Sequence, residues 1–63
     1  MYQIRLKDLK RGELFVRKPN SATIQTREDY DRREKKYLCG YWDDINKSLY
    51  LKGDTFVWAG FTF

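Results

Sequence analysis

Hydrophobic and polar positions alternate along the chain in short runs, and turn-forming residues separate these runs. Alternation with a period of two is typical of β-strands, whereas the apolar positions of a helix recur every three or four residues. We predict strands near 13–18, 22–30, 35–42, 47–51 and 55–62. Before the first strand, Leu6 and Leu9 are three residues apart and Gly12 follows, which predicts one helical turn or a turn-like loop.

Turn signals lie between the predicted strands. Pro19, followed by Asn20 and Ser21, marks a loop after the first strand. Residues 43–46, Asp-Asp-Ile-Asn, predict a four-residue hairpin turn, and Gly53 with Asp54 predicts a tight connection. Gly60, inside the last predicted strand, indicates a bulge or bend.

Residues 27–36 admit two interpretations. Acidic residues precede basic ones by four positions in the pairs Glu28/Arg32, Asp29/Arg33 and Asp31/Lys35, and this spacing supports a helix. Tyr30 is the only apolar residue in the segment, however, so a helix would have no apolar stripe with which to pack. We favour an exposed hairpin tip around 31–34 and keep the helix as the alternative.

Five short strands joined by hairpins predict an all-β fold, a small five-stranded antiparallel barrel or sandwich that forms a single domain over residues 1–63. Closing the sheet would remove exposed strand edges, which a chain rich in aromatic residues needs to avoid. The expected core consists of Leu9, Leu14, Val16, Ile24, Leu38, Cys39, Leu49, Leu51, Phe56, Val57 and Phe61, with parts of the other aromatic side chains.

Composition restricts the chemistry of so small a fold. The chain has 63 residues, one cysteine and no histidine, so it has no internal disulfide and no ligand set for structural zinc. General acid–base or triad catalysis usually needs a histidine or a carboxylate pair in a cleft. We therefore expect no enzyme activity, no metal, no cofactor and no small-molecule substrate.

Two residue groups could still carry chemistry. Asp43 and Asp44 are adjacent turn formers, and a weak divalent-cation site is the less favoured interpretation of them. Cys39 lies within an aromatic strand, where a small buried residue is a better interpretation than a nucleophile.

The chain contains no apolar stretch long enough to span a membrane and no N-terminal signal-peptide pattern. A single unpaired cysteine is typical of reducing compartments. We therefore expect a cytoplasmic protein without a membrane partner.

Charge and aromatic residues suggest two kinds of partner. The net charge is +4, and the basic residues are concentrated before residue 37. An aromatic surface would bind a protein partner or a second copy of the chain. Its candidate residues are Trp42, Tyr50, Tyr41, Trp58 and Tyr30.

A basic groove with aromatic platforms would instead bind single-stranded nucleic acid. The candidate cations are Arg27, Arg32, Arg33, Lys35, Lys36, Arg17 and Lys18. Acidic residues interrupt the densest basic run, so the sequence favours a protein partner over nucleic acid.

Several segments, in this order, resemble a family of very small proteins from gut bacteria, their mobile elements and their phages. These segments are 9–15 (LKRGELF), 30–32 (YDR), 36–39 (KYLC), 43–46 (DDIN) and 51–55 (LKGDT), with Phe61. The resemblance covers about residues 6 to 63. It implies an SH3-like five-stranded β-barrel, favours the hairpin at 27–36, and brings no catalytic residues with it. It also suggests that the chain binds or inhibits a host protein.

Overall fold

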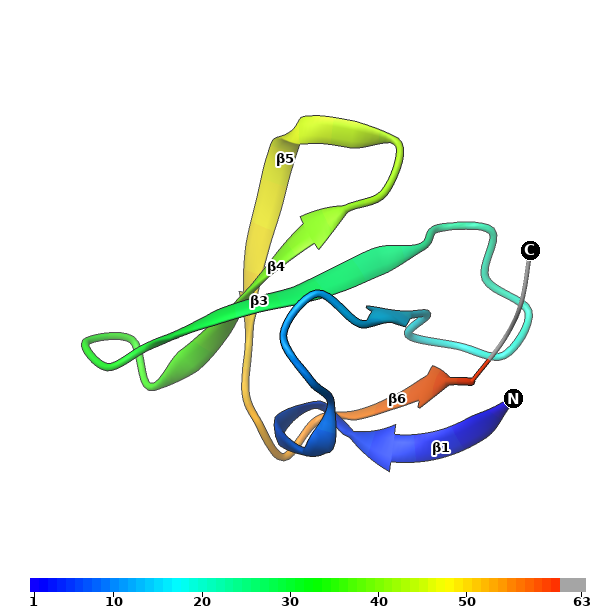
Figure 1. Cartoon of the computed structure of the whole chain (residues 1–63), viewed down its shortest axis with the longest axis horizontal. Helices are drawn as coiled ribbons and strands as arrows, with labels where there is room; N and C mark the ends of the chain where they lie inside the picture. The colour runs from blue at the N-terminus through cyan, green and yellow to red at the C-terminus, as the bar shows by residue number, and fades with distance from the viewer. Residues whose placement is uncertain (61–63) are drawn as a thin grey trace.

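The computed structural model describes residues 1–60, which form two antiparallel β-sheets and a single 3₁₀ turn (Figure 1). One sheet pairs β1 (Tyr2–Arg5) with β6 (Phe56–Ala59). The other has four strands in the order β2 (Leu14–Phe15), β3 (Gln25–Asp31), β4 (Lys36–Tyr41) and β5 (Asp44–Leu51). The 3₁₀ turn η1 (Leu6–Asp8) follows β1. The all-β prediction is therefore confirmed, with one strand more than expected.

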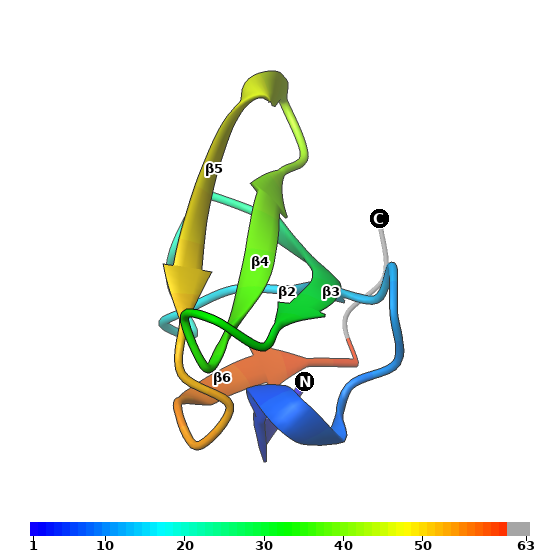
Figure 2. The same ribbon diagram turned by 90° about the vertical axis from the view of Figure 1, so that its left-hand side faces the viewer.

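Among residues 1–60, one isolated backbone bridge joins the two sheets. The backbone groups of Val16 and Trp58 exchange two hydrogen bonds of 2.8 Å, which link the end of β2 to β6. Figure 2 shows β6 lying below the upright strands β4 and β5. Within residues 1–60, β5 and β1 do not pair, so the sheets are not closed into the barrel that we expected.

The hydrophobic core lies between the two sheets. It consists of Leu6, Leu9, Phe15, Cys39, Val57 and Ala59, with Ile4, Tyr37 and Leu51 packed against it. The turn η1 brings Leu6 and the following Leu9 to the same side, because residues three apart overlie one another in a 3₁₀ turn. The Leu6 amide donates to the Thr55 carbonyl at 2.9 Å. The expected helical turn at Leu6–Leu9 is confirmed.

The hairpin that we favoured for residues 27–36 is confirmed, since β3 pairs with β4 across a turn. Oδ1 of Asp31 accepts hydrogen bonds from the amides of Arg33 (2.8 Å) and Glu34 (3.1 Å). Lys35 closes the turn with a φ of 55°. The acid–base pairs that suggested a helix are overridden because this segment has no apolar stripe to bury.

Several predicted strand bounds were wrong, and the strand predicted at 13–18 is reduced to the two residues of β2. Strand β5 begins at Asp44, not at residue 47, because Tyr41 pairs with Asp44 across a shorter turn. The sequence analysis predicts no strand before residue 13, yet residues 2–5 form β1, where Tyr2, Ile4 and Leu6 alternate with polar residues. The last predicted strand ends at Ala59 among the described residues, and Gly60 has a φ of 76°, which agrees with the expected bend.

The predicted core needs correction at one residue above all. Phe56 is 53% exposed, because Val57 and Ala59 are the residues of β6 that face inward. Some other predicted core residues are half-buried, namely Leu14, Ile24, Leu38, Leu49 and Leu51. The prediction omitted Leu6 and Ala59, and its Phe61 lies outside the described residues.

Candidate functional site

The structure contains two hollows at opposite ends of β4. Tyr37, Cys39 and Tyr41 share one face of this strand because side chains alternate. Tyr41 lines the first hollow and Tyr37 lines the second, while Cys39 is buried between them. Four residues of strand span about 13 Å, which is therefore the separation of the two tyrosine Cα atoms.

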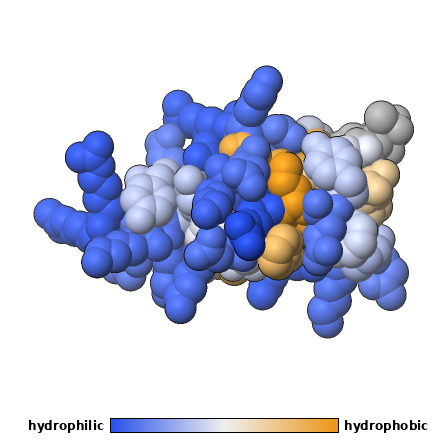
Figure 3. All heavy atoms as spheres, turned by 90° about the horizontal axis from the view of Figure 1, so that it is seen from below, coloured by the Kyte–Doolittle hydropathy of each residue, from blue (hydrophilic) through white to orange (hydrophobic). Residues whose placement is uncertain are grey.

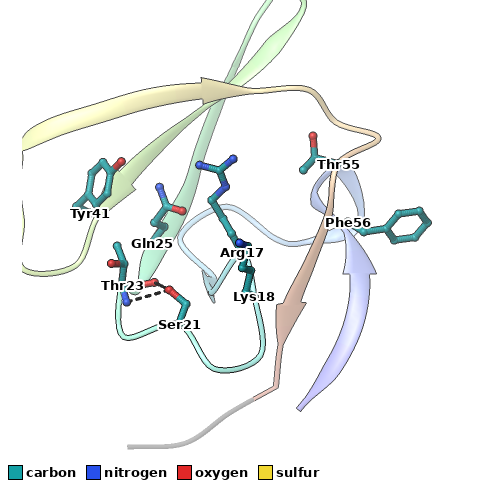
Figure 4. A pocket seen from close by; sticks show the side chains of 8 residues that line it. All are labelled: Arg17, Lys18, Ser21, Thr23, Gln25, Tyr41, Thr55 and Phe56. Carbon is teal, nitrogen blue, oxygen red and sulfur yellow. Dashed lines mark hydrogen bonds between the residues drawn. The ribbon is translucent and has the colours of Figure 1, made fainter.

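The first hollow, which we call the Gln25 hollow, has a volume of about 530 Å³. It is lined by Arg17, Lys18, Ser21, Thr23, Gln25, Tyr41, Thr55 and Phe56. Figure 4 shows the Gln25 side chain between those of Tyr41 and Arg17, whereas the ring of Phe56 points away. The ring of Phe56 contacts Arg5 instead, whose guanidinium carbon is 5.2 Å from the ring centroid.

A short loop forms the rim of the Gln25 hollow. The amide of Ser21 donates to the Lys18 carbonyl at 3.0 Å, so Pro19 and Asn20 form a turn as their residue types predict. The Ser21 hydroxyl oxygen then accepts from the Thr23 amide at 3.1 Å. These local bonds hold two hydroxyl groups and two cations around one opening.

Gln25 is a buried polar side chain, only 1% exposed. Its residue pairs with Phe15 on β2 and with Tyr41 on β4, so it lies on the inner face of the sheet, where a hydrophobic residue is expected. Its Nε2 atom has no hydrogen-bond partner among the described residues. An unsatisfied buried donor of this kind costs about 1–3 kcal/mol of stability.

The second hollow, the lysine hollow, has a volume of about 620 Å³. It is lined by Lys7, Tyr30, Glu34, Lys35, Lys36, Tyr37, Lys52, Gly53 and Asp54. The rings of Tyr30 and Tyr37 meet edge to face with centroids 4.9 Å apart. A Cβ atom at Gly53 would lie 3.0 Å from the Tyr37 ring, so this close approach requires a glycine or a shift of the ring.

Cations dominate the lysine hollow. Lys7 pairs with Asp54 at 3.1 Å, and its hydrogen bond lowers the pKa of that carboxyl group. Arg27, which pairs with Cys39 across β3 and β4, has its guanidinium carbon 4.3 Å from the Tyr37 ring centroid. Because Arg27 covers that ring, Tyr30 is the tyrosine of this hollow with the more accessible ring.

The residues that line these two hollows account for the net positive charge of the chain. Their lining residues include six lysines and arginines but only two carboxylates, a balance of +4. The net charge of the chain is also +4, from thirteen basic and nine acidic residues. The remaining seven basic and seven acidic residues therefore cancel. Figure 3 shows the hydrophilic surface covering the β3–β4 hairpin at the left.

The structure brings together some of the predicted site residues. Arg17 and Lys18 join Tyr41 in the Gln25 hollow, and Lys35 and Lys36 join Tyr30 in the lysine hollow. The exposed turn residues Arg32 and Arg33 line neither hollow.

The other aromatic candidates lie elsewhere. Trp42 and Tyr50 are exposed, and Trp58 is half-buried on β6. The sequence-based prediction missed the site residues Gln25, Ser21, Thr23, Thr55, Lys7, Tyr37 and Lys52. No sequence signal indicated Gln25, because the predicted core residue Ile24 places its neighbour Gln25 on the outer face of the second predicted strand.

Cys39 and Asp44, whose side chains could carry chemistry, have structural roles in the fold. Burial is the main cause that raises the pKa of Cys39, to about 11, so the thiol stays protonated at neutral pH and is a poor nucleophile. Asp44 uses its carboxylate to accept a hydrogen bond from the Asn46 amide at 3.0 Å. Within residues 1–60, no group of three or more potential metal-ligating side chains comes together.

In the part of the chain that the structure describes, no helix has the length and apolar character needed to cross a bilayer. Comparison with protein-family models, with curated proteins and with solved structures finds no match to this chain. A function must therefore be inferred from the two hollows themselves.

Proposed function

We propose that this chain binds single-stranded nucleic acid, with one contact point in each of the two hollows at opposite ends of β4. The observation that supports this proposal is the placement of charge. The two hollows have a balance of +4, while the charges on the rest of the chain cancel. Proteins that bind single strands combine such basic grooves with aromatic side chains on which bases stack.

Each hollow has both basic side chains and an aromatic ring. Tyr41 lies beside Arg17 and Lys18 in one, and Tyr30 lies beside Lys35 and Lys36 in the other. Phosphate contacts would supply most of the affinity, and unpaired bases would stack on the tyrosines. This distribution leads us to place nucleic acid ahead of the protein partner that the sequence favoured.

The topology supports an SH3-like fold as part of this proposal. Through the Val16–Trp58 bridge, the strands follow the spatial order β6, β2, β3, β4, β5. All neighbours in this order are antiparallel, as in an opened SH3-like barrel, and β1 adds one strand beyond β6. The resemblance to small SH3-like proteins of gut bacteria and phages remains a proposal that rests on the sequence segments alone.

The test is the binding of a fluorescent oligothymidylate of about 12 nucleotides, followed by anisotropy. The double variant Lys36→Gln/Lys52→Gln removes two charges from the lysine hollow. The matched control Arg32→Gln/Arg33→Gln removes two exposed charges that line neither hollow.

We expect the hollow variant to bind at least tenfold more weakly than the control. If both lysines contact phosphates, its plot of log affinity against log salt should be less steep by about 1.4. Equal losses in the two variants, or no binding by the wild type at about 50 mM salt, would contradict the proposal.

A second candidate function is supported by the tip of the β4–β5 hairpin, which projects from the molecule in Figure 1. Trp42 is 58% exposed and Ile45 is 94% exposed at this tip. Exposed aromatic and aliphatic anchors are typical of protein interfaces, so the tip could bind a host protein or a second copy of the chain.

Sedimentation at increasing concentration tests the second-copy form of this candidate. We expect a dimer of the wild type that Trp42→Ala/Ile45→Ser abolishes, since these two side chains would be its anchors. Capture of a host protein that survives nuclease treatment, and that the same double variant loses, would support the host-protein form. A monomeric chain that captures nothing would exclude this candidate.

A further inference from the structure

We propose that the Gln25 hollow reads one base of the bound strand, with the Gln25 amide pairing with an unpaired adenine. This inference rests on the proposed function and goes beyond it, because it assigns a sequence preference to one hollow. The feature that motivates it is the buried Nε2 donor, which has no partner within the described residues. A ligand that supplies an acceptor at this point would satisfy the donor.

The chemistry of the Gln25 side chain favours a base over a phosphate as the group that contacts it. A carboxamide offers a donor and an acceptor side by side, and its complement is an acceptor beside a donor. Adenine presents this pair at N7 and the N6 amino group, and glutamine pairs with it in this way. Arg17 and Lys18, on the rim of the same hollow, would contact the flanking phosphate.

The remaining residues of the hollow agree with this assignment. Tyr41 is beside Gln25 in both the strand pairing and Figure 4, so its ring is placed to stack on a base that enters the hollow. The volume of about 530 Å³ is in the range of sites that hold molecules of nucleotide size.

Access to the amide requires one movement. The Nε2 atom has almost no exposed surface, and Arg17 lines the same hollow. Arg17 is exposed, so its long side chain can swing outward. In the bound state the same guanidinium would pair with the phosphate, which couples the opening of the hollow to ligand binding.

The test compares oligothymidylates that differ only at one central base. We expect the wild type to bind the strand with a central adenine at least fivefold more tightly than all-thymine, cytosine or guanine strands. Gln25→Met keeps the size of the side chain but removes both polar groups, so it should abolish this preference. The matched control Gln3→Met, at an exposed position of β1, should keep the preference.

A second measurement does not depend on any variant. A central purine that lacks the 6-amino group should bind the wild type like thymine, because the partner of the glutamine oxygen is missing. Binding of every strand without preference for adenine, or a preference that survives in Gln25→Met or with the modified purine, would overturn this inference but not the proposed function. Failure to bind any strand would overturn both.

Discussion

Leu6 and Phe56 lie close together, since the neighbour of Leu6, Arg5, pairs with Phe56, yet their environments are opposite. Leu6 is fully buried in the core, whereas the ring of Phe56 is 53% exposed under the guanidinium of Arg5. Only the first of these side chains is surrounded by other core residues. Substitutions at these two positions therefore distinguish the contribution of core packing to stability from that of surface packing.

We expect Leu6→Ala to lower the free energy of unfolding by about 2–5 kcal/mol, because it leaves a cavity between the sheets. A domain of this size has a reserve of only about 3–5 kcal/mol, so this variant should be largely unfolded at room temperature. Phe56→Ala should remain folded and melt within a few degrees of the wild type. Thermal denaturation followed by circular dichroism checks both, and a folded Leu6→Ala would exclude Leu6 from the core.

Single residues also show the limits of sequence-based prediction. Alternation identified Val16, Cys39 and Val57 as buried, because hydrophobic side chains at inward-facing positions follow a simple rule. Gln25 breaks this rule, since it is polar and faces inward. Polarity alone places such a residue on the surface, so only the strand pairing with Phe15 and Tyr41 identifies it as part of a site.

At the scale of elements, the β3–β4 hairpin depends on Asp31. Its Oδ1 accepts two amide hydrogen bonds in the turn, and its Oδ2 accepts a weaker one from the Tyr50 hydroxyl at 3.3 Å. The carboxylate of Asp31 is also the main cause that raises the pKa of Tyr50. This side chain therefore connects the turn to the neighbouring strand β5.

We expect Asp31→Ala to destabilise the protein by about 1 kcal/mol, because exposed hydrogen bonds of this kind contribute modestly. Asp31→Asn retains an oxygen that can accept from the amides of Arg33 and Glu34, so it should lose less than half as much. Urea denaturation of the two variants measures the difference. Equal losses would mean that charge, and not the turn hydrogen bonds, is what Asp31 contributes.

Elements formed by neighbouring residues were predictable, whereas those that depend on distant partners were not. The β3–β4 and β4–β5 hairpins follow from alternation and turn residues, because each strand pairs with the next one along the chain. Strand β1 pairs with β6, so Tyr2 lies opposite Ala59 at the other end of the sequence. Nothing in residues 2–5 alone identifies that partner.

At the scale of the whole molecule, the shape of the fold determines where its basic side chains gather. The described residues form a flattened body of 33 × 24 × 16 Å, too thin to enclose a deep cavity. Its hollows are therefore open, and cations from distant parts of the chain, such as Lys7, Lys36 and Lys52, meet at one of them. The sequence predicted a basic N-terminal half, but only the fold shows that Lys52 joins it.

Concentrated positive charge should make the free protein more stable as salt increases. Salt screens the repulsion among the lining cations, so we expect a rise of about 0.5 kcal/mol, or about 2–4 °C in Tm, between low and physiological ionic strength. Scanning calorimetry measures it. Lys36→Gln/Lys52→Gln should show a smaller rise than Arg32→Gln/Arg33→Gln, and a fall in Tm with salt would contradict this electrostatic account.

Because Cys39 is the only cysteine and is buried, the rate at which its thiol is alkylated reports how often the fold opens. A protonated, buried sulfur does not react with an alkylating reagent until the strands around it separate. When opening and closing are faster than alkylation, the labelling rate equals the rate for an unfolded chain multiplied by the fraction of time spent open. The free energy of opening can thus be obtained without denaturant, and a ligand that binds only the closed form will slow the labelling in proportion to its occupancy.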